Sequence, residues 1–184
     1  TVEIKDGGLG LIRVSDDGEG MSRRDASLAF ERHATSKLRS DEQLGAVRTM
    51  GFRGEALPSI AAVSKVRLTT VARHDEVGTQ LWLTGGTITR VEDAAAIPGT
   101  TIDVSELFFN TPARRKFLKS TTTEFSHISH VVQQAALAWP QVHMRLVHNG
   151  YEVFALPAAS SPRDRVLQVY RAAFGERALA VDVE

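Results

Sequence analysis

The sequence contains no cysteine, which excludes disulfide bonds and thiolate metal sites and permits a reducing compartment. It contains no apolar run approaching the ~20 residues that a membrane-spanning helix needs, so we expect no membrane partner. It has no excess charge either, because 22 Lys and Arg residues balance 22 Asp and Glu residues. Contact with nucleic acid would therefore depend on a local basic patch rather than on net charge.

What is present is the composition of an ordinary globular protein, with 42% hydrophobic and 24% charged residues among 184. That length accommodates one well-buried core, or one domain and part of another. The chain opens directly in an alternating pattern, Val2 and Ile4 followed by Gly7-Gly8, which predicts a strand and a turn already inside a fold. We therefore expect the chain to be a piece of a longer protein.

Apolar periodicity predicts an α/β part at about residues 1–110. Ser22 is the predicted N-cap of a helix that ends near His33, with Asp25 in its first turn. Further helices are expected at 44–47 and 55–63. Alternating apolar residues predict strands at 9–15, 65–72, 79–83, 88–91 and 100–107. Gly85-Gly86 is predicted to form a hairpin turn between two of them.

A second domain is predicted to begin after about residue 120, following a basic linker at 111–120. Thr121 and Glu124 match a capping box that opens a long helix. A hairpin turning at Asn149-Gly150 and a helix at 162–174 follow. One buried stripe is predicted on the long helix, from Phe125, Ile128, Val132, Ala135 and Trp139, and Trp82 and Trp139 are both expected in the core.

The segment Asp16-Asp17-Gly18-Glu19-Gly20 follows a predicted strand directly. An acidic residue at a strand end can accept a hydrogen bond from the exocyclic amine of a base, and Gly18 and Gly20 let the backbone approach a flat ligand. Taken alone, the pattern fits a solvated turn or a calcium loop equally well. The EF-hand alternative fails because the twelfth position, counted from Asp16, is Ser27, which has no carboxylate.

Three further segments could contact a nucleotide, two of them its phosphates and one its base. The stretch His33-Ala34-Thr35-Ser36-Lys37 offers two hydroxyls and an ammonium to phosphates, although alone it is better explained as a basic helix end. The stretch 51–57, Gly-Phe-Arg-Gly-Glu-Ala-Leu, predicts either an anion site at a helix start or a plain glycine-rich loop. Thr100, at a strand start, is placed to share the contact of Asp16 with a base.

In this order and spacing, the segments resemble those of the GHKL (Bergerat-fold) ATPases, which include gyrase-type topoisomerases, heat-shock chaperones and histidine kinases. The strings HATSK, GFRGEAL and FFNTPARRKFLK resemble signatures of the MutL family of DNA mismatch repair proteins, and the last is not shared by the other branches. The resemblance extends over essentially the whole chain. It implies an α+β fold: a two-layer sandwich of the GHKL type without its N-terminal part, then the start of a ribosomal-S5-like domain at 121–184.

The resemblance also implies roles for individual residues. Asp16 would bind the adenine amine with help from Thr100, while Gly18 and Gly20 let the base lie against the backbone. Thr35, Ser36 and Lys37 would belong to the nucleotide lid. The phosphate-facing turn and helix start would consist of Arg53, Gly54, Glu55, Ala56 and Leu57.

In the family, ATP binding orders the lid and drives the N-terminal halves to form a homodimer, and hydrolysis resets that clamp. The implied partners are DNA without sequence preference, the mismatch-recognition protein MutS, and a downstream repair nuclease or helicase. The implied location is the bacterial cytoplasm, in association with the nucleoid, or the nucleus if the source is a eukaryote.

The family's E-x-x-x-N-x-x-D-A helix, with the general-base Glu and the Asn that holds Mg²⁺, is absent from residues 1–184. The second-domain Lys that reaches the γ-phosphate is expected beyond Glu184. We therefore predict that the parent protein uses ATP and Mg²⁺, whereas this chain has no catalytic residue and does not hydrolyse ATP. The alternative is a non-catalytic module for dimerisation and DNA or partner binding, in which nucleotide is only a ligand.

Two other groups of side chains are candidate binding sites, one for DNA and one for a metal ion. The densest basic cluster is predicted either to contact DNA phosphates or to be a solvated helix face, and it consists of Arg114, Arg115, Lys116 and Lys119. His127 and His130 lie three apart on the long helix, a spacing that can serve a metal ion. Since no carboxylate or further histidine completes a site nearby, we predict a polar helix face and no metal site.

Overall fold

The computed structural model describes residues 1–31 and 54–174, so the short helix predicted at 44–47 lies outside the described residues. The chain divides into two compact units, each of which is described by itself. One unit comprises Leu9–Leu118, and the other combines Thr1–Gly8 with the chain from Lys119 onward. No helix among the described residues is long and apolar enough to cross a membrane.

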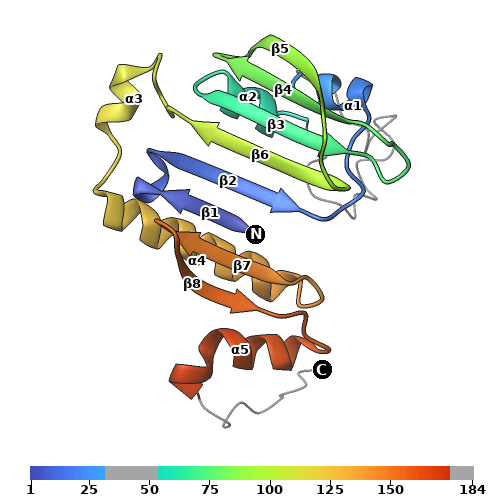
Figure 1. Ribbon diagram of the computed structural model, residues 1–184. Helices are drawn as coiled ribbons and strands as arrows, with labels where there is room; N and C mark the ends of the chain where they lie inside the picture. The colour runs from blue at the N-terminus through green and yellow to red at the C-terminus, as the bar shows by residue number, and fades with distance from the viewer. Residues whose placement is uncertain (32–53, 175–184) are drawn as a thin grey trace, which may run out of the picture. The chain divides into compact units, whose positions relative to one another are not determined.

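The unit from Leu9 to Leu118 contains five antiparallel strands in the order β5-β4-β3-β6-β2 (Figure 1). Their bounds agree with the predicted alternating segments to within a few residues, which confirms the period-two pattern. The strands are β2 Leu11–Asp16, β3 Lys65–Val71, β4 Gly78–Thr84, β5 Thr87–Ala94 and β6 Gly99–Ser105.

Two short helices, α1 Arg23–Leu28 and α2 Ala56–Ala61, lie on one face of this sheet (Figure 1). The hydroxyl of Ser22 accepts a hydrogen bond from the backbone N–H of Asp25, which confirms the predicted N-cap. Pro58 lies in the first turn of α2, where its missing N–H leaves no hydrogen bond unmade. The core between helices and sheet is formed by Ala26, Phe30, Ala61, Val66, Leu68, Leu81, Leu83 and Val104.

The opposite face of the sheet carries the alternate residues and is polar. Trp82 lies on this face and is only half-buried, because its neighbours Leu81 and Leu83 take the inward positions of β4. The expectation that Trp82 belongs to the core is therefore wrong. A single strand pattern does not reveal which residue set faces the helices when both sets contain a large apolar residue.

One further helix of this unit, α3 Pro112–Lys116, falls in the segment predicted to be a linker. Proline at its first position fits a helix start, since the ring presets φ. The preceding Asn110 side chain donates to the carbonyl of Ala62, 2.9 Å away, and the backbone N–H of Phe108 donates to Val63 O. These two hydrogen bonds tie the segment before α3 to the end of α2.

The other unit contains three strands, of which β1 Val2–Lys5 is parallel to β7 Met144–His148, and β7 is antiparallel to β8 Tyr151–Leu156. The β7–β8 turn is confirmed at Asn149-Gly150, both in the left-handed region with φ of 50° and 83°. The remaining elements are the 3-10 helix η1 Asp6–Gly8 and the helices α4 Thr121–Ala138 and α5 Pro162–Phe174. Helix α4 packs against η1, β7 and α5.

The start of α4 differs from the predicted capping box by one residue. The extended residue before the helix is Ser120, whose hydroxyl accepts from the backbone N–H of Thr123, while Glu124 accepts from the N–H of Lys119. Thr121 is therefore the first helical residue rather than the cap.

The buried face of α4 is also narrower than predicted. Val132 is buried on this helix and so is Ala136, which lies four residues further along the same face. Trp139 is 37% exposed and follows the last helical residue, so its expected place in the core is wrong as well.

Candidate functional site

Asp16 ends β2 and is exposed, on the face of the sheet that carries the helices. It is the register partner of Thr100 on β6, and directly paired residues of antiparallel strands project from the same face. The two residues predicted to recognise a base therefore lie side by side. Asp16 Oδ1 accepts a hydrogen bond from the backbone N–H of Gly18, 3.0 Å away, which shapes the start of the glycine loop.

A buried hydroxyl, Thr70 on β3, connects this loop to the sheet. Its Oγ1 lies 2.9 Å from the N–H of Met21, 3.0 Å from the carbonyl of Gly99 and 3.0 Å from the hydroxyl of Thr100. One hydroxyl has a single proton, so if Thr70 donates to Gly99 it accepts from both Met21 and Thr100. In that arrangement the hydroxyl proton of Thr100 is used within the protein, and its oxygen is left to accept from a ligand.

Sequence reasoning did not identify Thr70 as a site residue. Thr70 could have been recognised from the alternation of β3, because it places a hydroxyl at an inward position where the preceding inward residues, Val66 and Leu68, are apolar. A polar side chain that is 1% exposed in such a row needs hydrogen-bond partners, and the end of the Asp16 loop supplies them.

Gly20 has a packing role that does not involve a ligand. Its φ is +67°, and a Cβ atom at this position would lie 1.8 Å from the carbonyl oxygen of Val71. Any larger residue would push the loop away from β3, so glycine is needed here for the loop to reach Thr70 and its neighbours. The N–H of Arg73 donates to Glu19 O at 3.1 Å and holds the same segment of the loop.

The predicted phosphate-facing turn is described only in part. Gly54 has a φ of 62° and precedes Glu55, the cap residue of α2, while Ala56 and Leu57 form the first turn of that helix. The side chain of Glu55 makes no cap hydrogen bond. The lid residues Thr35, Ser36 and Lys37, together with Arg53, lie outside the described residues. The predicted approach of Arg53 to Asp16 therefore stays a prediction.

A cavity of about 510 Å³ lies on the opposite, polar face of the same sheet and does not coincide with the Asp16 loop. The residues that line it include Arg13, Lys65, Arg67, Trp82 and Asp103. Asp103 is the buried centre of this face. Burial raises the pKa of its carboxyl, but the hydrogen bonds and charges of Arg13 and Arg67 outweigh burial and hold that pKa below its ordinary value.

The basic cluster is exposed. Arg114, Arg115 and Lys116 occupy the last turn of α3, where cations interact favourably with the helix C-terminus, and Lys119 follows before α4. His127 and His130 are exposed on α4. Among residues 1–31 and 54–174, no group of three or more His, Asp or Glu residues is placed to hold a metal ion.

Comparison with known proteins places these features in a family, although no protein-family model matches the chain. The chain is 51% identical over 171 residues to the DNA mismatch repair protein MutL of Acidobacterium capsulatum, a match that covers 93% of this chain and 26% of the relative. It is 49% identical over 183 residues to the protein of the same name from Parabacteroides distasonis, covering 100% of this chain and 30% of the relative. The chain thus spans under a third of the length of these relatives.

Solved structures agree with this assignment. The Aquifex aeolicus MutL ATPase domain complexed with ADP superposes with a TM-score of 0.74 at 30% identity, covering 92% of this chain and 60% of that one. The N-terminal domain of a DNA repair protein superposes with a TM-score of 0.73 at 28% identity, covering 93% of this chain and 52% of that one. The α+β fold is that of the GHKL-type ATPase domains, and the chain belongs to the MutL family of DNA mismatch repair proteins, of whose N-terminal ATPase region it forms a part.

Proposed function

We propose that this chain is the nucleotide-binding part of a mismatch repair factor in which ATP binding and hydrolysis drive N-terminal dimerisation. In the whole protein, that cycle coordinates mismatch recognition by MutS with strand removal by a downstream nuclease or helicase. We propose that the protein acts in the bacterial cytoplasm, or in the nucleus if the source is a eukaryote. It is supported by 51% identity to a protein named for mismatch repair and by likeness to a MutL domain complexed with ADP.

The observation that carries the nucleotide proposal is the pairing of Asp16 with Thr100 at one end of the helix-covered face. An exposed carboxylate accepts a hydrogen bond from the amine of adenine, and the oxygen of the neighbouring threonine is left to accept a second hydrogen bond from the ligand. Gly18 and Gly20 place backbone rather than side chains beside the base. In the proposal, Gly54 to Leu57 and the residues Thr35, Ser36, Lys37 and Arg53 surround the phosphates.

Hydrolysis needs groups that the 184 residues do not contain. The E-x-x-x-N-x-x-D-A pattern, which supplies the general base and the Mg²⁺ ligand in the family, occurs nowhere in the sequence. Phosphoryl transfer relies on a metal ion and on positioned donors to stabilise developing charge. We therefore propose that the 184-residue chain binds ADP without hydrolysing ATP.

Two measurements on the purified chain test this proposal. Calorimetric titration with ADP should show saturable binding at one site, and an assay of phosphate release from ATP should show no activity above background. A version extended upstream to include the Glu/Asn helix should release phosphate. Absence of ADP binding would contradict the proposed nucleotide site. Saturable phosphate release from the 184-residue chain would contradict only the proposal that this chain does not hydrolyse ATP.

The exposed cluster on α3 supports DNA contact. Arg114, Arg115 and Lys116 are suited to phosphates, and such binding does not depend on base sequence. Substituting Arg114 and Arg115 by alanine should weaken duplex binding and reduce the slope of log Kd against log salt by about 0.9 per lost phosphate contact. An unchanged slope would leave the cluster as a solvated helix face.

A non-catalytic role is the second candidate, for which the exposed basic cluster on α3 offers a DNA-binding surface. In that case nucleotide acts only as a ligand of a dimerisation and DNA- or partner-binding module. The two candidates differ in one result: the extended version releases phosphate only if the module belongs to an ATPase.

A further inference from the structure

The turn between β7 and β8 is the pair Asn149-Gly150, and both residues are exposed. Their φ values of 50° and 83° place both in the left-handed region, as a two-residue hairpin turn requires. Asparagine followed by glycine is also prone to deamidation, because the next backbone nitrogen attacks the side-chain amide and glycine has no side chain to obstruct it. The chain contains one other asparagine, Asn110, so the surroundings of the two can be compared.

The reacting groups of Asn149 are accessible. Its Oδ1 accepts a hydrogen bond from the backbone N–H of Asp6 at 3.0 Å, and a donor in this position stabilises the negative charge that develops on the oxygen during attack. Among residues 1–31 and 54–174, neither Nδ2 of Asn149 nor the N–H of Gly150 has a hydrogen-bond acceptor. Nothing lies within 4 Å of the position of a Gly150 Cβ, so the peptide plane has room to rotate toward the side chain.

The corresponding groups of Asn110 are occupied. Its Nδ2 donates to Ala62 O at 2.9 Å, and the N–H of the following Thr111 donates to Phe108 O at 3.1 Å. Threonine also places a β-branched side chain beside the nitrogen that would attack. The fold therefore holds both the leaving group and the nucleophile at Asn110, whereas it holds neither at Asn149.

We propose that Asn149 is a site of spontaneous deamidation in the folded chain. The nitrogen of Gly150 attacks Cγ of Asn149, the Cγ–Nδ2 bond breaks, and Nδ2 leaves as ammonia with the proton of the Gly150 N–H. Water then opens the resulting cyclic imide. Opening at the side-chain carbonyl gives aspartate, and opening at the main-chain carbonyl gives isoaspartate, in which the chain continues through Cγ.

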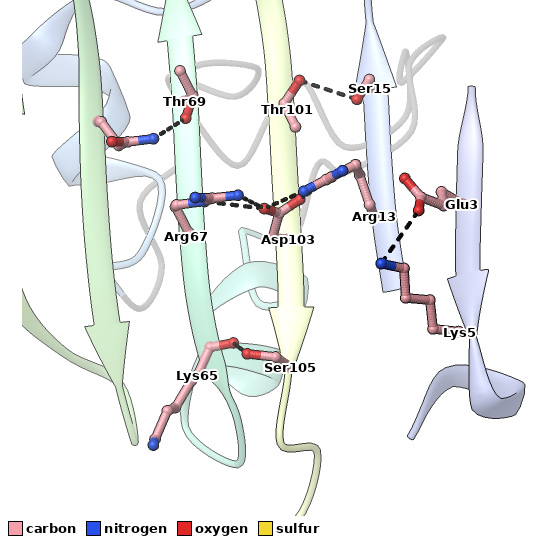
Figure 2. Close-up of polar contacts among 11 residues, drawn as sticks. Glu3, Lys5, Arg13, Ser15, Lys65, Arg67, Thr69, Thr101, Asp103 and Ser105 are labelled. Carbon is pink, nitrogen blue, oxygen red and sulfur yellow. Dashed lines mark hydrogen bonds and ion pairs between the residues drawn. The ribbon is translucent and has the colours of Figure 1, made fainter. Parts of the chain in front are cut away.

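The modified residue lies where β1 is attached to β7. The parallel pairing of these strands ends at Ile4 and His148, directly before the turn. The N–H of Asn149 extends the pairing by donating to Ile4 O at 2.9 Å. The ion pair between Lys5 and Glu3 joins two residues of β1 itself, so this pair does not attach the strand to β7 (Figure 2).

Isoaspartate changes this attachment in two ways. It adds a carbon atom to the main chain of a two-residue loop, and the length of such a loop fixes the register of the hairpin. It also moves the oxygen that accepts from Asp6 into the main chain and leaves a charged carboxylate on the turn. We therefore expect the isoaspartyl product to loosen β1 and η1 from β7, an effect that does not involve the proposed nucleotide site.

Peptide mapping by mass spectrometry tests the modification. The folded 184-residue chain is incubated at mildly alkaline pH, which favours loss of the Gly150 N–H proton, and protein-isoaspartate methyltransferase is used to detect isoaspartate. Conversion at Asn149 should be about tenfold faster or more than at Asn110, because no hydrogen bond of the reacting groups has to break first.

A matched pair of variants tests the role of the turn. Gly150→Ala should slow conversion about tenfold or more, because its methyl group lies beside the attacking nitrogen. Gly86→Ala is the control: Gly86 also lies in a hairpin turn, with a φ of +86° against +83°, and its added Cβ comes no closer than 3.4 Å to another atom. This control should convert at Asn149 as fast as the parent chain.

Hydrogen exchange tests the consequence for β1. The isoaspartyl chain, isolated by ion exchange, is compared with Asn149→Asp, which carries the same charge but keeps the length of the main chain. Exchange of the β1 N–H groups should accelerate in the isoaspartyl chain and not in Asn149→Asp.

Four results would overturn the proposal. They are the absence of conversion at Asn149 in the folded chain, equally fast conversion at Asn110, equal rates in Gly150→Ala and Gly86→Ala, and equal exchange in the isoaspartyl chain and Asn149→Asp. None of these measurements uses a nucleotide, so their outcome is independent of whether the chain binds ADP.

Discussion

Asp16, at the end of β2, and Thr100, at the start of β6, are register partners, and both project from the helix-covered face of the sheet. One oxygen of Asp16 already accepts from the N–H of Gly18, and we propose that the other oxygen contacts the amine of a base. The recognition of adenine in the proposed site thus depends on a single carboxylate oxygen with a threonine beside it.

Replacing Asp16 by asparagine should weaken ADP binding roughly tenfold or more, because a charged acceptor is lost. The side-chain oxygen of asparagine would stay with Gly18, and its amide group would then oppose the base amine, donor against donor. Isothermal titration measures the change. Asp17→Asn is the control, since Asp17 is exposed and adjacent, and equal losses from the two substitutions would contradict the assignment.

Thr70→Val should lower the free energy of unfolding by about 1–3 kcal/mol, because the buried polar groups around Thr70 lose their partner. It should also weaken ADP binding, since the loop after Asp16 is positioned through Thr70. Thr70→Ser, which keeps the hydroxyl, should restore binding. The control is Thr69→Val, on the opposite face, and urea denaturation with ADP titration of all three variants decides whether Thr70 positions the loop.

Gly20→Ala should destabilise the protein by about 3 kcal/mol or more, because the new Cβ would overlap the carbonyl of Val71. Gly150→Ala provides the comparison: its φ is +83°, but nothing lies within 4 Å of the added atom. That substitution adds only backbone strain and should cost about 1 kcal/mol. Similar melting temperatures for the two variants would show that the loop containing Gly20 shifts to accommodate the added methyl group at little cost.

Asp103→Asn should destabilise the folded chain by about 1–3 kcal/mol at neutral pH, because two guanidiniums lose their shared carboxylate. The pKa of Asp103 is lower in the folded chain than its ordinary value of 3.8. Its contribution to stability is therefore complete above pH 3.8 and is lost as the pH falls through the folded value. The parent and the variant should thus converge in stability at acid pH.

Denaturation series between pH 7 and pH 2 would test this. Asp93→Asn, which removes an exposed partner of Arg23, should change stability by no more than about 1 kcal/mol. A constant difference between Asp103→Asn and the parent across the series would show that the carboxylate charge is not the cause.

Arg165→Met should destabilise the unit that contains β7 and β8 by about 2–4 kcal/mol. The side chain of Arg165 is fully buried and donates to the carbonyls of Pro140 and Val142, both 2.6 Å away, and of Leu156. Methionine fills similar space but leaves these carbonyls without their donor. Hydrogen exchange of β7 and β8 should accelerate in this variant but not in Arg145→Met, where an exposed ion pair is lost.

The sequence by itself determined the elements and the family. Period-two alternation located the strands, and the pair Asn149-Gly150 and the cap Ser22 located a turn and a helix start, because these signals depend only on residues close in the chain. The strings around Gly54 and Asn110 indicated the MutL family for the same reason. The acidic residue at a strand end, the hydroxyl at a strand start and the resemblance to the GHKL ATPases together predicted that Asp16 and Thr100 belong to one site.

Only the tertiary structure decided which strands are neighbours and which residue of each alternating pair faces the helices. The parallel pairing of Val2 with Leu146, the three hydrogen bonds of Thr70 and the alignment of Arg67 between Trp82 and Asp103 all join residues far apart in the chain. No local pattern contains the register between distant strands. A one-residue change of register would move every side chain of a strand to the other face, so such contacts follow from packing of the whole core.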